Sequence, residues 1–241
     1  MKRVRFTVDG NTLRGTFFYP QPMKAKNPAI LFIQGWTGDM RRSYGYARAL
    51  SKLGCICFLF DVRGHGQSEG DIKKTTTREF LNDVVSAYDV VAKANGVDPN
   101  NMSVIGGSFG GYLGSILTTK RKVTNLALRV PADYRDAWFD KIKWETSGVT
   151  TPEVWAFRKR LKKPSESMAL AAMHKFNGNV LIVESEKDTV VPHETMVNYA
   201  NAVSDKTKLT HIVIKGAPHS IKRGPFRDKV EKIYVDWFKN R

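Results

Sequence analysis

Residues 106–110, Gly-Gly-Ser-Phe-Gly, have the composition of a sharp turn that exposes a nucleophile. They follow the apolar and β-branched run 102–105, which predicts a buried strand, and precede 111–117, which predicts a helix. A strand that turns directly into a helix strains the backbone at the turn, and flanking glycines leave room for the close approach. We therefore expect the Ser108 hydroxyl to project clear of a sheet, although the short pattern alone also fits a glycine-rich turn with an incidental serine.

A serine hydroxyl is a weak nucleophile until a base removes its proton and a third group orients that base. His219 is the expected base, because it lies in the loop directly after the predicted strand 211–214 and can reach the carboxyl edge of the sheet. The other histidines occupy less suitable positions: a turn (His65), a long insertion (His174), the start of a helix (His193) and a strand (His211).

Asp188 is the expected orienting acid, because it lies just beyond the predicted strand 180–184. Glu184 and Glu186 are the alternatives, but Glu184 still belongs to the strand and Glu186 is less well placed to turn inward. The serine, the aspartate and the histidine each follow a strand end, so we expect the three side chains to converge at one edge of the sheet.

Attack on a carbonyl group creates a negative oxygen that needs hydrogen-bond donors, and loss of one donor costs ~10²–10³ in rate. The main-chain N–H of Phe109, directly after the serine, is one expected donor. The loop Gln34-Gly35-Trp36-Thr37-Gly38 follows the predicted strand 29–33 and offers the N–H of Trp36 as the other. The alternative is that this second loop is only a glycine turn.

The remaining pattern predicts the elements that hold these loops. Alternating residues predict two antiparallel strands at the amino terminus, 4–8 and 13–19, after which apolar strands alternate with amphipathic helices. The further predicted strands are 29–33, 56–60, 102–105, 125–128, 180–184 and 211–214, and the clearest helices are 44–53, 78–94 and 229–239. This order predicts an α/β protein whose central sheet has about eight mostly parallel strands, with helices on both faces.

One segment, residues 131–177, is far longer than an ordinary connection between a strand and the next element. It is rich in aromatic and basic residues and is expected to form a small cap over the carboxyl ends of the strands. Trp138, Trp144 and Trp155 lie in it and are candidate substrate-pocket residues. The alternative is that these tryptophans only anchor the cap to the body.

The composition, with 41% hydrophobic residues over 241 positions, predicts one large domain with a packed core. The formal net charge of +16 comes from scattered basic residues without a nucleic-acid-binding motif, so we expect no nucleic-acid partner, while weak binding to an anionic surface stays open. No run approaches the ~20 apolar residues that cross a bilayer, and the basic, alternating start does not resemble a signal segment. These features predict a cytoplasmic protein, in which Cys55 and Cys57 are buried and reduced.

Taken together, five segments resemble an α/β-hydrolase over essentially the whole chain except the cap. They are the serine turn, Gly35–Gly38, Asp61–Ser68 (Asp-Val-Arg-Gly-His-Gly-Gln-Ser), Asp188 before Val-Pro, and Gly216–His219. The resemblance is closest to small bacterial carboxylesterases, including the feruloyl and cinnamoyl esterase group, and implies a single domain, 1–241, carrying the cap insertion. It also implies that Asp61–Ser68 is mainly structural and that neither a metal nor an organic cofactor is used. Gln34 departs from the pattern, because many relatives have histidine there, and we expect it to alter the support of the loop.

The expected activity is cleavage of a small-molecule carboxylic ester through an acyl-enzyme, with Ser108, His219 and Asp188 as nucleophile, base and orienting acid. A thioesterase, a monoacylglycerol-type lipase or an acyl-peptidase uses the same residues and remains an alternative. A non-catalytic binding protein on the same fold is a more remote one, since no member of the triad is missing.

Overall fold

The computed structural model describes residues 1–239 and 241 and contains one eight-stranded sheet in the order β1-β2-β4-β3-β5-β6-β7-β8. The strands are β1 (Lys2–Val8), β2 (Asn11–Phe18), β3 (Asn27–Ile33), β4 (Ile56–Asp61), β5 (Val97–Gly107), β6 (Asn125–Arg129), β7 (Asn179–Lys187) and β8 (Leu209–Pro218). β1 and β2 form an antiparallel hairpin and β2 is antiparallel to β4, whereas all other neighbours are parallel. The predicted α/β fold with a mostly parallel sheet is confirmed.

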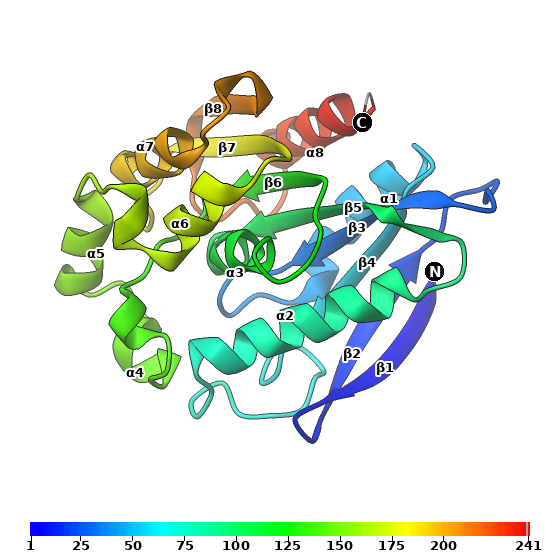
Figure 1. Cartoon of the computed structure of the whole chain (residues 1–241), viewed down its shortest axis with the longest axis horizontal. Coiled ribbons are helices and arrows are strands. Elements are labelled where there is room, and N and C mark those ends of the chain that lie inside the picture. The colour runs from blue at the N-terminus through cyan, green and yellow to red at the C-terminus, as the bar shows by residue number, and fades with distance from the viewer. Residues whose placement is uncertain (240) are drawn as a thin grey trace.

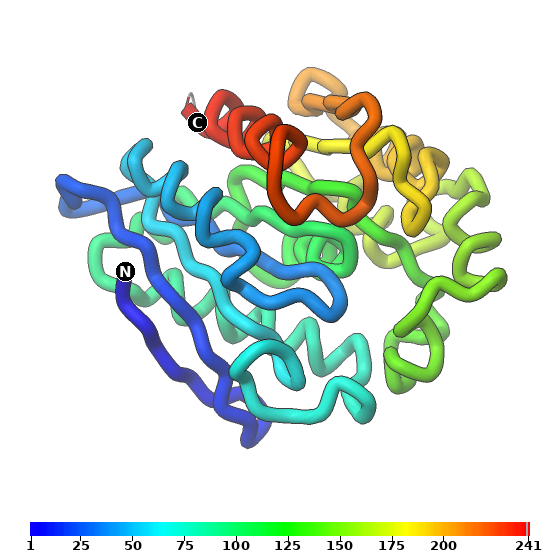
Figure 2. The backbone as a smooth tube through the Cα atoms, turned by 180° about the vertical axis from the view of Figure 1, so that it is seen from behind, coloured from blue at the N-terminus to red at the C-terminus, as the bar shows by residue number. Residues whose placement is uncertain are grey.

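Helices cover both faces of the sheet, because its central strands are apolar on both sides. One face carries α2 (Thr77–Ala92), α3 (Phe109–Leu117), α6 (Met168–Lys175) and α7 (His193–Ala202), which lie in front of the sheet in Figure 1. The other face carries α1 (Tyr44–Ser51) and α8 (Pro225–Phe238), which are in front in the reverse view of Figure 2. The chain therefore has two apolar layers, one on each side of the sheet.

Some boundaries differ from those expected from the sequence. β5 begins at Val97 rather than 102, because residues 97–101 continue as extended backbone before the apolar run starts. α3 begins at Phe109, immediately after the serine turn, rather than at 111. α8 begins at Pro225 rather than 229, since proline is favoured in the first turn of a helix, where its missing N–H costs nothing.

Residues 131–177 fold mainly as short helices. They are η2 (Asp136–Trp138), α4 (Lys143–Ser147), α5 (Pro152–Lys159), η3 (Pro164–Glu166) and α6. α6 packs on α3 and belongs to the body, whereas α4 and α5 lie together at one end of the sheet in Figure 1. The Lys143 N–H donates to the Thr75 carbonyl oxygen (3.0 Å), so main-chain contact joins the start of α4 to the start of α2.

Within residues 1–239 and 241, no helix has both the length and the apolar character needed to cross a bilayer.

Candidate active site

Ser108 occupies a strained turn between β5 and α3. Its φ of 51° and ψ of −116° lie outside the regions that serine ordinarily adopts. The turn is possible because glycines stand on both sides. A Cβ atom on Gly106 would lie 2.4 Å from the Gly110 oxygen, and one on Gly110 would lie 2.2 Å from the Ile33 oxygen. The close approach of three backbone segments therefore holds the serine at the end of β5, at the carboxyl edge of the sheet.

His219 and Asp188 are brought together from two neighbouring strand ends. His219 Nδ1 lies 2.6 Å from Asp188 Oδ2, and the two side chains are 17% and 4% exposed. The second carboxylate oxygen, Oδ1, accepts the N–H groups of Val190 and Val191, each at 2.8 Å. A carboxylate held on both oxygens fixes the imidazole, so that Nδ1 carries the proton and Nε2 is left as an acceptor.

The two alternative acids, Glu184 and Glu186, form hydrogen bonds with groups other than His219. Both carboxylate oxygens of Glu184 are bound by imidazoles, with His193 Nδ1 at 2.6 Å and His211 Nε2 at 2.9 Å. Burial raises the pKa of Glu184, but the hydrogen bonds from His211 and His193 outweigh it and hold that pKa below its ordinary value. Glu186 Oε2 accepts the Gly216 N–H at 2.8 Å. Asp188 is therefore the carboxylate that meets His219.

Arg129 connects the serine turn to the histidine loop, a link that the sequence did not reveal. Its carbonyl oxygen accepts the Ser108 N–H at 2.9 Å. Its guanidinium donates to the main-chain oxygens of His219 and, at 3.5 Å, of Pro218. One residue at the end of β6 thus bonds to the backbone of both candidate catalytic loops.

The two expected oxyanion donors lie next to the serine. A Cβ on Gly35 would lie 3.5 Å from Ser108 Cβ, so the loop after β3 passes close to the turn. The Trp36 and Phe109 rings pack edge to face with centroids 5.6 Å apart. In the described part of the chain, neither main-chain N–H donates a hydrogen bond, so both are free to bind a developing negative oxygen.

The loop after β4, expected to be mainly structural, supports this second donor. The Thr37 N–H donates to His65 Nε2 at 3.2 Å, and His65 Nδ1 lies 3.0 Å from the Arg63 carbonyl oxygen. The imidazole is therefore neutral with its proton on Nδ1, and burial lowers its pKa. Gln34 adds a further bond within the loop, from Nε2 to the Gly38 oxygen at 3.2 Å.

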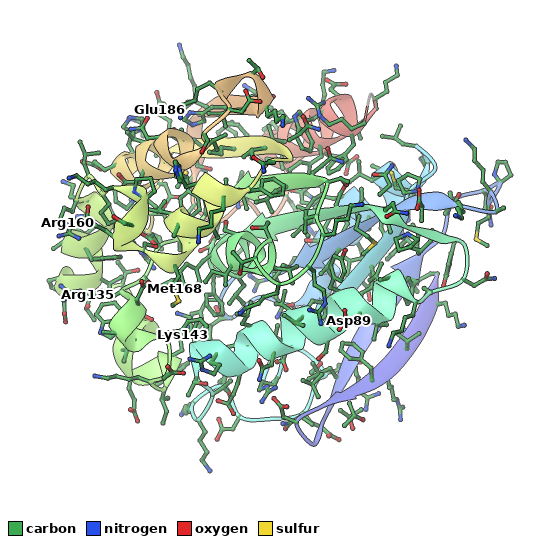
Figure 3. The ribbon with its side chains drawn as sticks, viewed as in Figure 1. Asp89, Arg135, Lys143, Arg160, Met168 and Glu186 are labelled. Carbon is green, nitrogen blue, oxygen red and sulfur yellow. The ribbon has the colours of Figure 1, made fainter. Side chains whose placement is uncertain are left out.

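Lys143, at the start of α4, is wholly buried against the same loops. Its Nζ lies 4.0 Å from the ring centroid of Tyr134, 4.4 Å from that of Phe109 and 4.7 Å from that of Trp36. Two of these rings belong to the candidate oxyanion donors. Figure 3 labels Lys143 beside α4 and the first turn of α2.

The Lys143 amine donates to the Ser147 carbonyl oxygen at 3.2 Å and to its hydroxyl at 3.1 Å, and no carboxylate forms an ion pair with it among the described residues. Burial, together with the nearby Arg158 guanidinium, holds the pKa of Lys143 well below its ordinary value. Sequence alone gave no signal for this residue, because lysine in a short polar helix ordinarily lies on the surface.

Trp144 is the cap tryptophan that the structure brings to the site. Its side chain is 40% exposed, its ring centroid lies 6.3 Å from that of Trp36, and Lys73 Nζ lies 5.6 Å from its centroid. An exposed aromatic face beside a candidate oxyanion loop is suited to contact a substrate group.

The other two candidate pocket tryptophans have different surroundings. Trp138 packs against Phe157, with ring centroids 6.5 Å apart, and under the Arg135 guanidinium at 5.4 Å. Trp155 is half-buried with Lys159 at 5.9 Å from its ring. Their contacts lie within the cap, which favours the anchoring interpretation for these two, and their role in a pocket stays a prediction.

Among residues 1–239 and 241, no group of three or more histidine, cysteine, aspartate or glutamate side chains is arranged to hold a metal ion. Cys55 and Cys57 are buried and free, as expected.

A serine elbow after β5 of a mostly parallel eight-stranded sheet, followed by an acid after β7 and a histidine after β8, defines an α/β-hydrolase of the serine-hydrolase type. Residues 43–241 match the model of the prolyl oligopeptidase family, and the chain belongs to that family. The resemblance to α/β-hydrolases seen in the sequence is thereby confirmed.

Known proteins of this class resemble the chain over most of its length. An α/β-hydrolase domain-containing protein of Arabidopsis thaliana, WAV2, is 26% identical over an alignment of 220 residues, and the match covers 88% of this chain and 69% of WAV2. The mitochondrial palmitoyl-protein thioesterase ABHD10 of Pongo abelii is 25% identical over 219 residues, covering 83% of this chain and 69% of ABHD10. The structure of Est1E from Butyrivibrio proteoclasticus with ferulic acid bound has a TM-score of 0.74 at 18% identity, covering 98% of each chain.

Proposed function

We propose that this protein cleaves carboxylic esters through an acyl-enzyme formed on Ser108. The observation that carries the proposal is the 2.6 Å contact between His219 Nδ1 and the doubly held Asp188 carboxylate, at the same sheet edge as the strained serine turn. A strained backbone and a fixed imidazole are costly features, and proteins keep them where they serve chemistry.

In the proposed reaction His219 Nε2 takes the proton of the Ser108 hydroxyl while Oγ attacks the ester carbonyl carbon. The main-chain N–H groups of Trp36 and Phe109 hold the resulting oxyanion. The proton then passes from His219 to the leaving alkoxide as the carbon–oxygen bond breaks. Water, deprotonated by the same imidazole, attacks the acyl-enzyme, and the acid product leaves with Ser108 restored. Asp188 stays ionised throughout and stabilises the imidazolium.

An ester is proposed over an amide because an alkoxide leaving group needs less protonation than an amine. A thioester is the second candidate, favoured by the similarity to a protein named palmitoyl-protein thioesterase. An acyl-peptidase and a monoacylglycerol-type lipase use the same residues and are separated by substrate, not by mechanism. We also propose a small-molecule substrate and a cytoplasmic location, the latter supported by the two buried free thiols.

The test is covalent labelling with a fluorophosphonate followed by a substrate panel. The wild-type protein is expected to label on Ser108 and to show its highest kcat/KM on aryl or short acyl esters, with lower values on acyl thioesters and aminoacyl anilides. Ser108→Ala is expected to abolish labelling and turnover with an unchanged circular dichroism spectrum. Ser115→Ala, in the buried interior of α3, is the matched control and should label normally.

The outcomes of labelling and of the substrate panel distinguish the candidate functions. No labelling of folded wild-type protein would support the non-catalytic binding alternative and overturn the proposal. Labelling with higher kcat/KM on thioesters or anilides would keep the serine mechanism and replace the substrate class. Salt-resistant binding of duplex DNA without esterase activity would revive a nucleic-acid role for the basic surface.

A further inference from the structure

Two adjoining cavities lie outside the candidate active site, along α3 and α6. The smaller, about 340 Å³, is bounded by α2, α3, α6 and the residue Phe139. The larger, about 780 Å³, is bounded by the segments that precede β6 and β7, at the amino ends of the strands. Thr119, Ala172 and Lys175 line both, so the two cavities adjoin, and the pair of them is called the groove.

The smaller cavity is walled mainly by apolar side chains. They come from three helices and the start of the cap: Leu81, Ile116, Phe139, Met168 and Ala171. Met168 is labelled in Figure 3 at the start of α6, facing the region between α2 and α3. Its volume falls within the range of about 300–1,000 Å³ that small-molecule sites occupy. An alkyl chain placed there would remove apolar surface from water on both partners.

The mouth of this cavity and the larger one carry positive charge. Lys175 lines both cavities and Lys120 lines the smaller one, and both side chains are exposed and form no ion pair among the described residues. Further along the groove Lys122 is also exposed, and its amine donates to Asn100. Over residues 1–239 and 241, no aspartate or glutamate lines either cavity.

The arginine in the larger cavity differs, because it is already neutralised. Arg121 makes two hydrogen bonds of 2.7 Å to the Asp89 carboxylate, which lies on α2. Arg78 in the smaller cavity is likewise paired with Asp140, and Lys208 in the larger cavity with Asp205. These pairings leave Lys120, Lys122 and Lys175 as the lining cations without an ion pair among the described residues. The groove therefore joins an apolar pocket to a cationic rim.

We propose that this groove binds an anionic amphiphile, with its alkyl chain in the smaller cavity and its carboxylate or phosphate headgroup between Lys120 and Lys175. An uncharged alkyl chain would form no ion pair with the lysines, and a small inorganic anion would leave the apolar walls in contact with water. A ligand that fits the apolar cavity and the cationic rim together has an alkyl chain and an anionic headgroup. This site lies along α3 and α6 and is separate from Ser108, so it does not depend on the proposed esterase activity.

Calorimetric titration with decyl phosphate and with decanoate, each below its micelle concentration, tests this proposal. Ser108→Ala protein is used, so that turnover and product binding are absent. Decyl phosphate or decanoate is expected to bind, the stronger of the two identifying the headgroup, while inorganic phosphate and a neutral decyl maltoside bind at least about tenfold more weakly, since each makes half of the contacts.

Three variants locate the binding. Ala171→Trp fills the smaller cavity. The double substitution Lys120→Ser with Lys175→Ser removes two positive charges at exposed positions, where the stability of the fold should change little. Each is expected to weaken binding about tenfold or more. Lys52→Ser, at an exposed position after α1 on the other face of the sheet, should leave binding unchanged. Unchanged binding in the double variant, or equal binding of inorganic phosphate, overturns the proposal.

Discussion

His65 Nε2 accepts a hydrogen bond from the Thr37 N–H, and this contact joins the loop after β4 to the loop after β3 that carries the Trp36 N–H. The His65 ring also packs edge to face on the Trp36 ring, with centroids 5.3 Å apart. A residue one loop away from the proposed chemistry therefore sets where one oxyanion donor points.

His65→Gln is predicted to lower kcat about tenfold with little change in KM. The substitution would displace the Trp36 N–H without removing it, so the loss in rate should be smaller than the ~10²–10³ that follows removal of an oxyanion donor. Steady-state kinetics on the best ester checks this. His174→Gln, an exposed histidine on α6, is the matched control. A change in KM alone would contradict a role at the transition state.

The same contact predicts a pH dependence. Burial lowers the pKa of His65 from 6.5, so the folded state favours the neutral ring. The stability that this preference contributes is complete above about pH 6.5 and falls as the pH drops through that value, because the unfolded state then binds more protons. Thermal unfolding from pH 8 to pH 5 should show a smaller loss in His65→Gln than in the wild-type protein.

Arg129→Met is predicted to lower kcat by up to about 10², since small displacements of a catalytic group have effects of that size. The substitution keeps a flexible, unbranched side chain and removes both bonds to the His219 loop. Fluorophosphonate labelling of Ser108 should slow in parallel, with KM unchanged. Arg3→Met, exposed on β1, should behave as the wild type.

Lys143→Met is predicted to flatten the rise of stability with pH. Because the pKa of Lys143 is lowered in the folded protein, there is a pH range in which this amine is protonated in the unfolded chain and neutral in the folded protein. In that range the wild-type free energy of unfolding rises with pH, by up to about 1.4 kcal/mol per pH unit from this group. The rise stops near pH 10.4, the approximate pKa of lysine in the unfolded chain. Urea unfolding of both proteins between pH 7 and pH 10 measures the difference in slope. Identical slopes would contradict a suppressed pKa.

Trp144→Ala is predicted to change the ratio of kcat/KM between aryl and alkyl esters by about tenfold, which corresponds to loss of one aromatic contact. The rate of fluorophosphonate labelling should stay within twofold, a size that reflects an unchanged nucleophile. Trp155→Ala compares the two interpretations for a second cap tryptophan, and an anchoring role predicts an unchanged ratio between the two ester classes. Equal loss on every substrate would show that Trp144 only anchors the cap.

The sequence was sufficient for the sheet, and it placed Ser108, Asp188 and His219 directly after strands, where the structure has them. Their catalytic roles stay predictions. Strand ends are readable from apolar runs, and parallel strands bring their carboxyl ends to one edge. Whether Glu184 or Asp188 meets the histidine depends on how far each lies past the end of β7, and this was also readable.

The supporting residues were not predictable in the same way. The roles of His65 and Arg129 depend on contacts between loops that are far apart in the chain, and a single sequence carries no record of such contacts. Lys143 was hidden for another reason, since its burial is a consequence of three aromatic rings that converge from separate segments. The observed starts of β5 and α8 differ from the predicted ones because the residue pattern defines the ends of a strand or helix less sharply than its interior.

Strand β1 forms one outer margin of the sheet and presents main-chain groups that have no neighbour on that side within the described chain. Three of its four exposed positions carry cations, Lys2, Arg3 and Arg5, and the fourth is Thr7. Another copy of the protein arriving to lengthen the sheet there would meet three like charges, and edge cations of this kind oppose self-association. Part of the high positive charge therefore lies where it disfavours extension of the sheet by a second copy.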